Sequence, residues 1–228
     1  MQRVSNPEIL DSNHCPPGEA QISLRDLDRI NRWFGGVATT RTLVEAVCAE
    51  TGARDLSLLE VAAGRGEVPR VAARQLARRG INLQISLSDR VPAHLTQGDH
   101  EIAADALQLP FRDNAFDLVS CNLFAHHLEP PELERFTQEA LRVSRLALLI
   151  NDLIRSSLHL ALVYAGFALM KSPVSRHDGV VSVKRAYLPG EIAAMLSNDG
   201  SRRIEISRHY LFRMGVIVWK HPRSGTTV

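Results

Sequence analysis

The segment EVAAGRG, residues 60–66, combines a carboxylate with small residues directly after a short apolar run. The small residues let the backbone turn sharply and let a ligand approach the main chain closely. The turn leads into an expected helix, whose free N–H groups suit a negatively charged group such as a carboxylate. The segment therefore indicates a ligand site. The alternative is a plain strand-to-helix turn that needs glycine for its own geometry.

A nicotinamide dinucleotide is one ligand that such a turn could hold. The dinucleotide fingerprint requires a third small residue where the helix packs on the strand. Counted from Ala62 that position is Glu67, and counted from Gly64 it is Pro69, so neither frame fits. Glu60 is also unfavourable beside a pyrophosphate, but it suits a ligand ammonium group. These residues favour an amino-acid-bearing nucleoside over a dinucleotide.

Two further carboxylates end the next apolar runs. Asp89 ends NLQISLSD, where a carboxylate can accept hydrogen bonds from both hydroxyls of a ribose. Asp105 ends HEIAAD, where it could accept a bond from an adenine amino group. Ala106 and Leu107 could then offer a backbone N–H and an apolar wall to the ring. Polar residues commonly end strands, so each carboxylate alone is a weak indication.

Polar residues also follow the apolar run FDLVSCN, residues 116–122. Asn122 ends this run and faces the place where a transferable group would lie. His126 and His127 follow, and histidine titrates near neutrality, so either could take a proton from an acceptor. The alternative is that one histidine packs beneath the strand end while the other is solvated.

The elements that carry these residues alternate along the chain. Apolar runs predict buried strands at 56–62, 82–89, 100–105, 116–122 and 146–152. Helices are expected at 67–79 and from Pro130 to about 144. Strands and helices in turn imply right-handed crossovers and a parallel sheet covered on both faces. Ligands bind such sheets at the carboxyl ends of the strands, where the residues above lie.

The two ends of the chain differ from this alternation. The runs 202–210 and 214–220 lie too close together for a crossover helix, so they are expected to be antiparallel neighbours. Helices are expected at 24–34 and about 39–51, after a polar leader of about 20 residues that should be loose. We therefore expect an α/β fold in which residues 1–52 form a leader with cap helices.

The order of these segments resembles the class I S-adenosylmethionine (SAM)-dependent methyltransferases, especially the small-molecule branch that includes ubiquinone and menaquinone biosynthesis methyltransferases. The resemblance covers about residues 55–220 and rests on the glycine turn, Asp89, ADALQLPF, FDLVSCNLFAHHL and the terminal hairpin. It implies a Rossmann-like, doubly wound seven-stranded sheet of order 3-2-1-4-5-7-6, with strand 7 antiparallel. It also implies a methyltransferase domain at 53–228 and a helical lid insertion at about 153–190.

The resemblance further implies a set of SAM-binding residues at the strand ends. They are Glu60, Ala62, Gly64 and Gly66 for the methionine end, Asp89 for the ribose, Asp105 and Ala106 for the adenine, and Asn122 for the sulfonium side. The family's first glycine is Ala62 here, which could narrow the cofactor cleft. The usual proline-glycine-glycine before strand five is replaced by V-S-R-L.

The expected lid carries the remaining candidates. LHLALVYAGFALM, residues 158–170, predicts an apolar helix that suits either a wall for an apolar acceptor or ordinary helix packing. Residues 174–187 are expected to be a loop rich in ionisable groups. His177 with Asp178 is the preferred general base, and His127 and Tyr187 are further catalytic candidates. The alternative is a solvated loop.

Bulk composition argues against other classes of protein. The net charge is +2 and the basic residues are scattered, so no stripe for nucleic acid exists. The longest apolar run is too short to span a bilayer, and the N-terminus lacks the apolar region of a secretory signal, so the cytoplasm is the default location. The three cysteines lie far apart, and no Cys/His spacing supports a metal site.

The sequence thus predicts a cytoplasmic enzyme that moves a methyl group from SAM to an oxygen or activated carbon. The expected acceptor is a small, apolar phenolic, quinone-like or polyketide molecule. An NAD(P)-dependent oxidoreductase and a SAM-fold protein without catalysis are the alternatives. The identity of the acceptor and the oligomeric state, a homodimer included, stay open.

Overall fold

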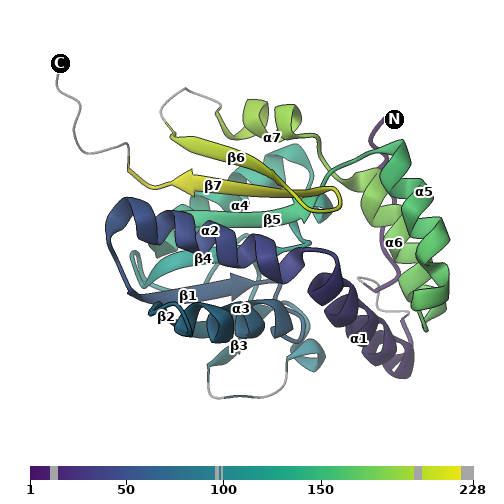
Figure 1. The fold of residues 1–228 in the computed structure, drawn as a ribbon, viewed down its shortest axis with the longest axis horizontal. Helices are drawn as coiled ribbons and strands as arrows, with labels where there is room; N and C mark the ends of the chain where they lie inside the picture. The colour runs from purple at the N-terminus through teal and green to yellow at the C-terminus, as the bar shows by residue number, and fades with distance from the viewer. Residues whose placement is uncertain (11–14, 96–97, 99, 198–201, 222–228) are drawn as a thin grey trace.

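The computed structural model describes residues 1–10, 15–95, 98, 100–197 and 202–221, and a seven-stranded sheet forms the centre of this part of the chain (Figure 1). The strands are β1 (Asp55–Val61), β2 (Asn82–Asp89), β3 (Glu101–Ala103), β4 (Phe116–Asn122), β5 (Ser144–Leu153), β6 (Ile204–His209) and β7 (Arg213–Trp219). Their order is β3-β2-β1-β4-β5-β7-β6. β1 to β5 are parallel, and β7 pairs antiparallel with β5 and β6. The predicted topology and terminal hairpin are confirmed.

Helices cover both faces of this sheet (Figure 1). They are α1 (Pro17–Trp33), α2 (Gly36–Thr51), α3 (Glu67–Ala77), α4 (Pro130–Val143), α5 (Ser157–Ala165), α6 (Pro173–Arg185) and α7 (Pro189–Leu196). Three short 3₁₀ helices are η1 (Pro92–His94), η2 (Ala125–His127) and η3 (Gly166–Leu169). α2 and α3 pack on one face, and α4 and α7 pack on the other.

Strand β1 is buried on both faces of the sheet, which explains why its sequence is continuously apolar. Leu58 belongs to the core cluster beneath α2 and α3, whereas its neighbour Leu59 belongs to the cluster beneath α4 and α7. Neither side chain has any exposed surface. Since successive side chains point to opposite faces, a strand covered on both sides must be apolar at adjacent positions. The strand therefore lies in the middle of the molecule, and its carboxyl end opens at one edge.

Residues 174–187 are mostly helical, so the expected loop is wrong. Helix α6 begins after Ser172, whose side chain accepts a hydrogen bond from the backbone N–H of Val174 at 3.1 Å, and Pro173 occupies its first turn. Gly179 weakens the helical pattern of the sequence, but it lies where α6 packs against α5. A Cβ at this position would lie 3.4 Å from Val163 of α5, which crosses close by.

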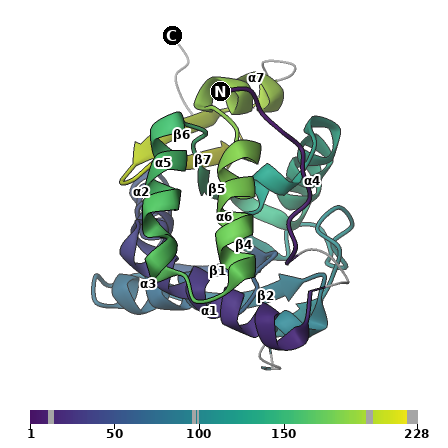
Figure 2. The same ribbon diagram turned by 90° about the vertical axis from the view of Figure 1, so that its right-hand side faces the viewer.

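The N-terminal residues are also ordered against the rest of the chain, so the expected loose leader is wrong for residues 1–10. Figure 2 shows these residues as a purple segment alongside α6. The backbone N–H groups of Ile9 and Leu10 donate to the two carboxylate oxygens of Asp178, at 2.8 and 2.9 Å. Charge-assisted bonds of this kind hold a chain that has no apolar face of its own. Residues 11–14 of the expected leader lie outside the described residues.

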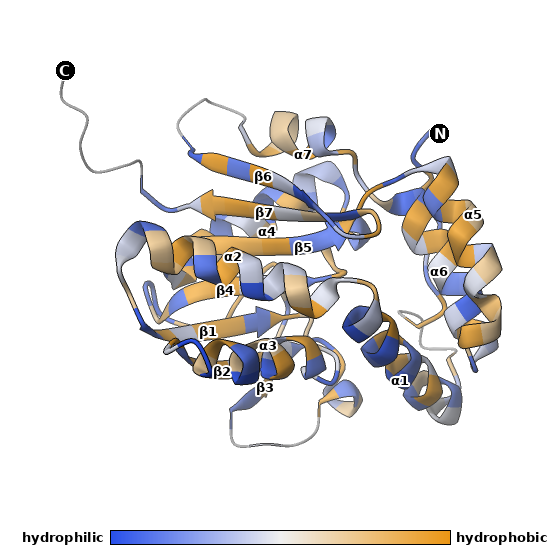
Figure 3. Cartoon of the chain, in the orientation of Figure 1, coloured by the Kyte–Doolittle hydropathy of each residue, from blue (hydrophilic) through white to orange (hydrophobic). Residues whose placement is uncertain are grey.

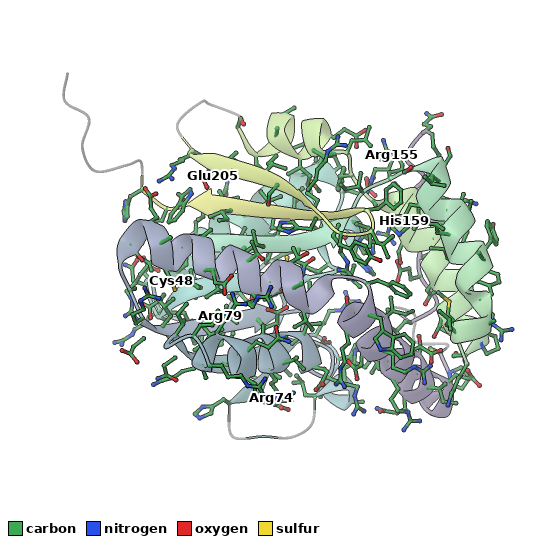
Figure 4. All side chains as sticks on the ribbon, in the orientation of Figure 1. Cys48, Arg74, Arg79, Arg155, His159 and Glu205 are labelled. Carbon is green, nitrogen blue, oxygen red and sulfur yellow. The ribbon has the colours of Figure 1, made fainter. Side chains whose placement is uncertain are left out.

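Two arginines complete this attachment. Arg3 donates to the carbonyl of Arg185 at 2.8 Å, and its guanidinium lies 4.3 Å from the ring centre of Tyr187. Arg155, labelled in Figure 4, donates to the carbonyl of Met1 at 3.0 Å and forms an ion pair with Glu191 of α7. We call residues 1–10 the N-terminal strap, because these contacts fasten them across α6.

Helix α5 is apolar and lies at the edge of the molecule (Figure 3). Leu158, Leu162 and Tyr164 expose 61%, 43% and 50% of their surface. The expected lid after β5 is therefore helical, but α5 contributes no residue to the main cavity described below. Among the described residues, no helix is both long and apolar enough to cross a membrane.

Candidate functional site

A cavity of about 370 Å³ opens at the carboxyl ends of β1, β2 and β4. It brings together the three carboxylates that the sequence singled out at successive strand ends, Glu60, Asp89 and Asp105. The other predicted residues that line it are Ala62, Gly64, Ala106, Leu107, Asn122, His126 and His127. We call this space the main cavity.

The turn after β1 supplies the floor of the main cavity. Ala62, Gly64 and Gly66 all have left-handed backbone conformations, with φ of 53°, 52° and 68°. A Cβ on Gly64 would meet only a Leu24 methyl group at 3.5 Å, so the turn leaves space beside the main chain. A Cβ on Gly66 would lie 2.2 Å from Leu87, so this glycine lets α3 pack against β2. Gly66 thus supports the site without lining it.

Glu60 is a buried carboxylate that faces the main cavity. Its side chain accepts hydrogen bonds from the Ser120 hydroxyl and from Nδ2 of Asn122, the latter at 2.6 Å. Burial raises the pKa of Glu60 to about 7, although these two hydrogen bonds act to lower it. A cation in the cavity would stabilise the ionised carboxylate. The position is therefore suited to a ligand ammonium group.

Asp89 shapes the turn and still has capacity to bind a ligand. One carboxylate oxygen accepts the N–H of Gly64 at 2.8 Å, and the other accepts the N–H of Val91 at 2.9 Å. Burial acts to raise the pKa of Asp89, but hydrogen bonds from His94, Val91 and Gly64 lower it below its ordinary value. Each oxygen of an ionised carboxylate has two lone pairs. Asp89 can therefore accept further bonds from hydroxyl groups.

Asp105 and Ala106 form another wall of the main cavity. Asp105 is exposed, and its side chain accepts the backbone N–H of Leu107 at 2.9 Å. Ala106 is buried beside it, in contact with the core cluster on the α4 side. A carboxylate next to an apolar surface can bind a ring amino group while the ring packs on the wall.

Asn122 lies between Glu60 and a buried polar network. Its Oδ1 accepts bonds from the Thr40 hydroxyl at 2.9 Å and from Nδ2 of Asn151 at 2.5 Å. Asn151 also donates to the carbonyl of Gly36 at 2.7 Å. Because both partners of Oδ1 are donors, the amide nitrogen of Asn122 must face Glu60. The network therefore fixes the orientation of both side chains.

The sequence did not point to two carboxylates that flank His126, one of which, Glu8, lines the main cavity. Asp152, at the end of β5, accepts the backbone N–H of His126 at 3.0 Å and lies 2.6 Å from its Nδ1. Glu8 of the N-terminal strap lies 3.3 Å from Nε2 of the same ring. Burial acts to lower the pKa of His126, but the two carboxylates raise it to about 9. Asp152 could have been predicted, because it lies at the carboxyl end of an apolar strand, whereas no pattern in the sequence points to Glu8.

The predicted catalytic residues divide between the main cavity and the surface of α6. His127 lines the cavity, with Nε2 3.7 Å from the Glu8 carboxylate. His177 contacts Asp178 at 2.8 Å, as expected, but it faces a separate hollow beside α5. The carboxylate of Asp178 is the one that holds the N-terminal strap.

Tyr187 is likewise held away from the main cavity. Its hydroxyl donates to the carbonyl of Leu128 at 2.8 Å, and burial raises its pKa to about 12. The structure therefore brings the eight predicted cofactor residues to one turn and cavity, together with His127. It does not bring His177, Asp178 or Tyr187 there.

Comparisons with known proteins agree with this arrangement. Residues 59–146 match a family model described as a methyltransferase domain. No curated protein sequence matches the chain. The matched segment runs from β1 into β5, so it contains the glycine turn and all three strand-end carboxylates.

Solved structures show the same fold over most of the chain. A SAM-dependent methyltransferase from Aquifex aeolicus is 14% identical, with a TM-score of 0.59 over 90% of this chain and 98% of that one. The plantazolicin methyltransferase BpumL, in complex with a triazolic desmethylPZN analog and S-adenosylhomocysteine (SAH), is 13% identical, with a TM-score of 0.67 over 90% and 92%. The CMeT domain of a citrinin polyketide synthase is 12% identical, with a TM-score of 0.52 over 74% and 47%.

Two of these comparisons bear on the predicted cofactor, one through the matched domain and one through the shared fold. The matched domain is a methyltransferase domain, and the BpumL complex contains SAH, the product that SAM leaves after methyl transfer. The similarity of domain and fold supports the predicted cofactor. Residues 59–146 are therefore similar to a methyltransferase domain, and the chain has the seven-stranded fold seen in structures of SAM-dependent methyltransferases.

Proposed function

We propose that this protein binds SAM in the main cavity and transfers its methyl group to an oxygen or activated carbon of a small acceptor. The observation that carries the proposal is the convergence of Glu60, Asp89 and Asp105. These residues come from three different strand ends, yet all three line one cavity beside the open turn at Gly64.

The residues present fit SAM. Glu60 would bind the ammonium group, because a cation would stabilise its buried carboxylate. Asp89 would accept the ribose hydroxyls and Asp105 the adenine amino group, while the turn at Gly64 leaves space for the methionine end. SAM supplies a methyl group activated by a positively charged sulfur. Asn122 would line the sulfonium side, where its amide is fixed by hydrogen bonds on both atoms.

The chain's own contribution to the reaction is alignment and the exclusion of water. Leu10, Phe124 and Leu128 line the main cavity and give it apolar surface for an acceptor. Polar groups from Glu8 and His127 lie in the same cavity, so an acceptor with one polar atom on an apolar body fits best. A phenolic, quinone-like or polyketide acceptor has this character, and one structural neighbour is a polyketide synthase domain.

Several finer expectations stay predictions. The ubiquinone-like branch and the cytoplasmic location belong to this group, whereas His177 and Asp178 lie outside the main cavity and do not fit the role of base for an acceptor bound there. A homodimer is a further state that the proposal allows. The two alternatives to the proposal are an NAD(P)-dependent oxidoreductase and a SAM-fold protein without catalysis.

Calorimetry with SAM, SAH and NADH tests the binding step. We expect SAM and SAH to bind and NADH not to bind. Asp89→Ala should weaken binding of SAH by about 1–3 kcal/mol, because ribose hydroxyls would lose a charged acceptor. Binding of NADH but not SAM, or an unchanged affinity in Asp89→Ala, would contradict the proposal. Methyl release from labelled SAM over a panel of phenols and quinones then separates an enzyme from a non-catalytic binder.

A further inference from the structure

Glu8, His126 and His127 all line the main cavity, and each brings one atom that could bind a metal ion close to the other two. All three atoms lie within 4.8 Å of one another. Oε1 of Glu8 lies 3.3 Å from Nε2 of His126 and 3.7 Å from Nε2 of His127. Bonds of about 2.0–2.1 Å from a tetrahedral Zn²⁺ would place its nitrogen and oxygen ligands about 3.3–3.5 Å apart. The two distances to Glu8 already lie close to that spacing, and the third pair of atoms lies within 4.8 Å.

The surroundings of His126 match those of a metal ligand. Asp152 accepts from both the backbone N–H and the ring Nδ1 of His126, at 3.0 and 2.6 Å. With the Nδ1 proton held by Asp152, a metal ion would displace the proton on Nε2 and take its lone pair on the side that faces Glu8. Metal-bound histidines typically donate their other ring nitrogen to a carboxylate in this way, which fixes the ring and raises its basicity.

Glu8 is held in place even though it belongs to an N-terminal segment. The Ser182 hydroxyl of α6 donates to its Oε1 at 2.6 Å. The next two residues, Ile9 and Leu10, are anchored by Asp178. The Glu8 side chain is 7% exposed, so its carboxylate is buried next to two imidazoles. The N-terminal strap therefore holds a carboxylate beside two imidazole rings in the main cavity.

We propose that Glu8, His126 and His127 bind a divalent transition-metal ion, with Zn²⁺ as the best match, and that the ion's open position takes an oxygen of the methyl acceptor. Imidazole ligands suit Zn²⁺ and its neighbours, whereas Mg²⁺ and Ca²⁺ prefer oxygen alone. Three protein ligands with one open position are typical of catalytic zinc sites. All three ligands line the main cavity, so an acceptor held there could reach the fourth position.

The second half of this proposal rests on the proposed methyl transfer and names the acceptor as one with an ionisable hydroxyl, such as a phenol or enol. Coordination lowers the pKa of the hydroxyl, whose proton leaves to solvent. The acceptor oxygen then forms a bond to the methyl carbon while the carbon–sulfur bond breaks, and SAH departs with that electron pair. No group changes oxidation state.

Cobalt binding to the full chain tests the site directly. The purified protein, free of any affinity tag, is treated with EDTA and titrated with Co²⁺ while visible absorption is recorded, and Zn²⁺ is then added in competition. We expect one Co²⁺ per chain, displaced by Zn²⁺. Glu8→Gln and His127→Ala should each weaken binding by more than the about 10–100-fold that loss of an outer-shell partner costs. His221→Ala, which changes an exposed histidine, is the matched control.

Wild-type Co²⁺ affinity in both ligand variants, or no binding by the natural chain, would overturn the metal site. Calorimetry with SAH on the same variants shows whether they are folded and keeps the two proposals separate. Failure of the natural chain to bind SAH would remove the methyl-transfer proposal and leave the Co²⁺ result standing. A chain that binds SAH and methylates phenols equally well with and without EDTA would overturn the metal's role in transfer.

Discussion

At the scale of single residues, the site depends on a carboxylate that the fold buries before any ligand is bound. Glu60 is 1% exposed, and burial raises its pKa to about 7, well above its ordinary value of 4.5. Between these two values the ligand-free chain therefore loses stability as the pH rises, since the folded state favours the protonated form. A bound ammonium group would reverse that preference.

This charge state makes SAM binding depend on pH. Affinity should fall as the pH drops from about 8 to about 6, because Glu60 becomes protonated and no longer attracts the ammonium group. Glu60→Gln should weaken binding about tenfold to a hundredfold at pH 8, as expected for loss of a charged hydrogen bond. Calorimetry across this pH range measures both effects. A variant that keeps the full pH dependence would show that another group is responsible.

The strand-end carboxylates were predictable because strands buried on both faces are easy to recognise, and the residue after each one has a known position. Glu8 was not predictable. It lies 118 residues before His126, and no local pattern links the two. Only the folded path of the N-terminal strap brings them together.

At the scale of elements, the turn between β1 and α3 has room for glycine only at position 66. Gly66 has a φ of 68°, and Leu87 of β2 occupies the place of its missing side chain. The sequence showed that the turn needed small residues, but it could not show which of them served the ligand and which served helix packing. The structure assigns Gly66 to packing.

Gly66→Ala should therefore destabilise the chain by about 2–4 kcal/mol, from the strained φ together with overpacking against Leu87. Gly80→Ala is the matched control, because its φ is 73° but a Cβ there would meet nothing within 4 Å. That variant should lose only the smaller contribution of the strained φ. Urea unfolding measures both free energies. Equal losses would show that contact with Leu87 does not matter.

Helix α6 occupies most of the segment 174–187, where the sequence predicted a loop. Its β-branched valines and Gly179 are poor helix formers, so the sequence favours a loop there. Tertiary contacts override this preference, because α5 packs against Gly179 and the N-terminal strap binds Asp178. Propensity alone could not reveal either partner.

At the scale of the whole molecule, the sheet order and the hairpin of β6 and β7 followed from the resemblance and from the short connection between the two strands. The N-terminal strap did not follow from either, because polar residues near a chain end usually remain loose. In the structure these residues contact α6 directly and α7 through Arg155, and Glu8 lines the main cavity. The strap therefore brings residues from the N-terminal part of the chain into the site.

Asp178→Ala should release the strap, because Ile9 and Leu10 would lose the acceptors of their N–H groups. Hydrogen exchange at these two amides should become faster by about tenfold or more, and stability should fall by about 1–3 kcal/mol. Asp113→Ala, which removes a carboxylate with 70% of its side chain exposed, is the control. Unchanged protection of Ile9 and Leu10 would mean that other contacts hold the strap.

The central claim is that carboxylates from three strand ends form one site for SAM. A crystal structure of the chain with SAH tests it most directly. We expect the ribose hydroxyls at Asp89, the amino group of the adenine at Asp105 and the ammonium group at Glu60. Density for SAH anywhere outside the main cavity, or in it with none of these three contacts, would contradict the account.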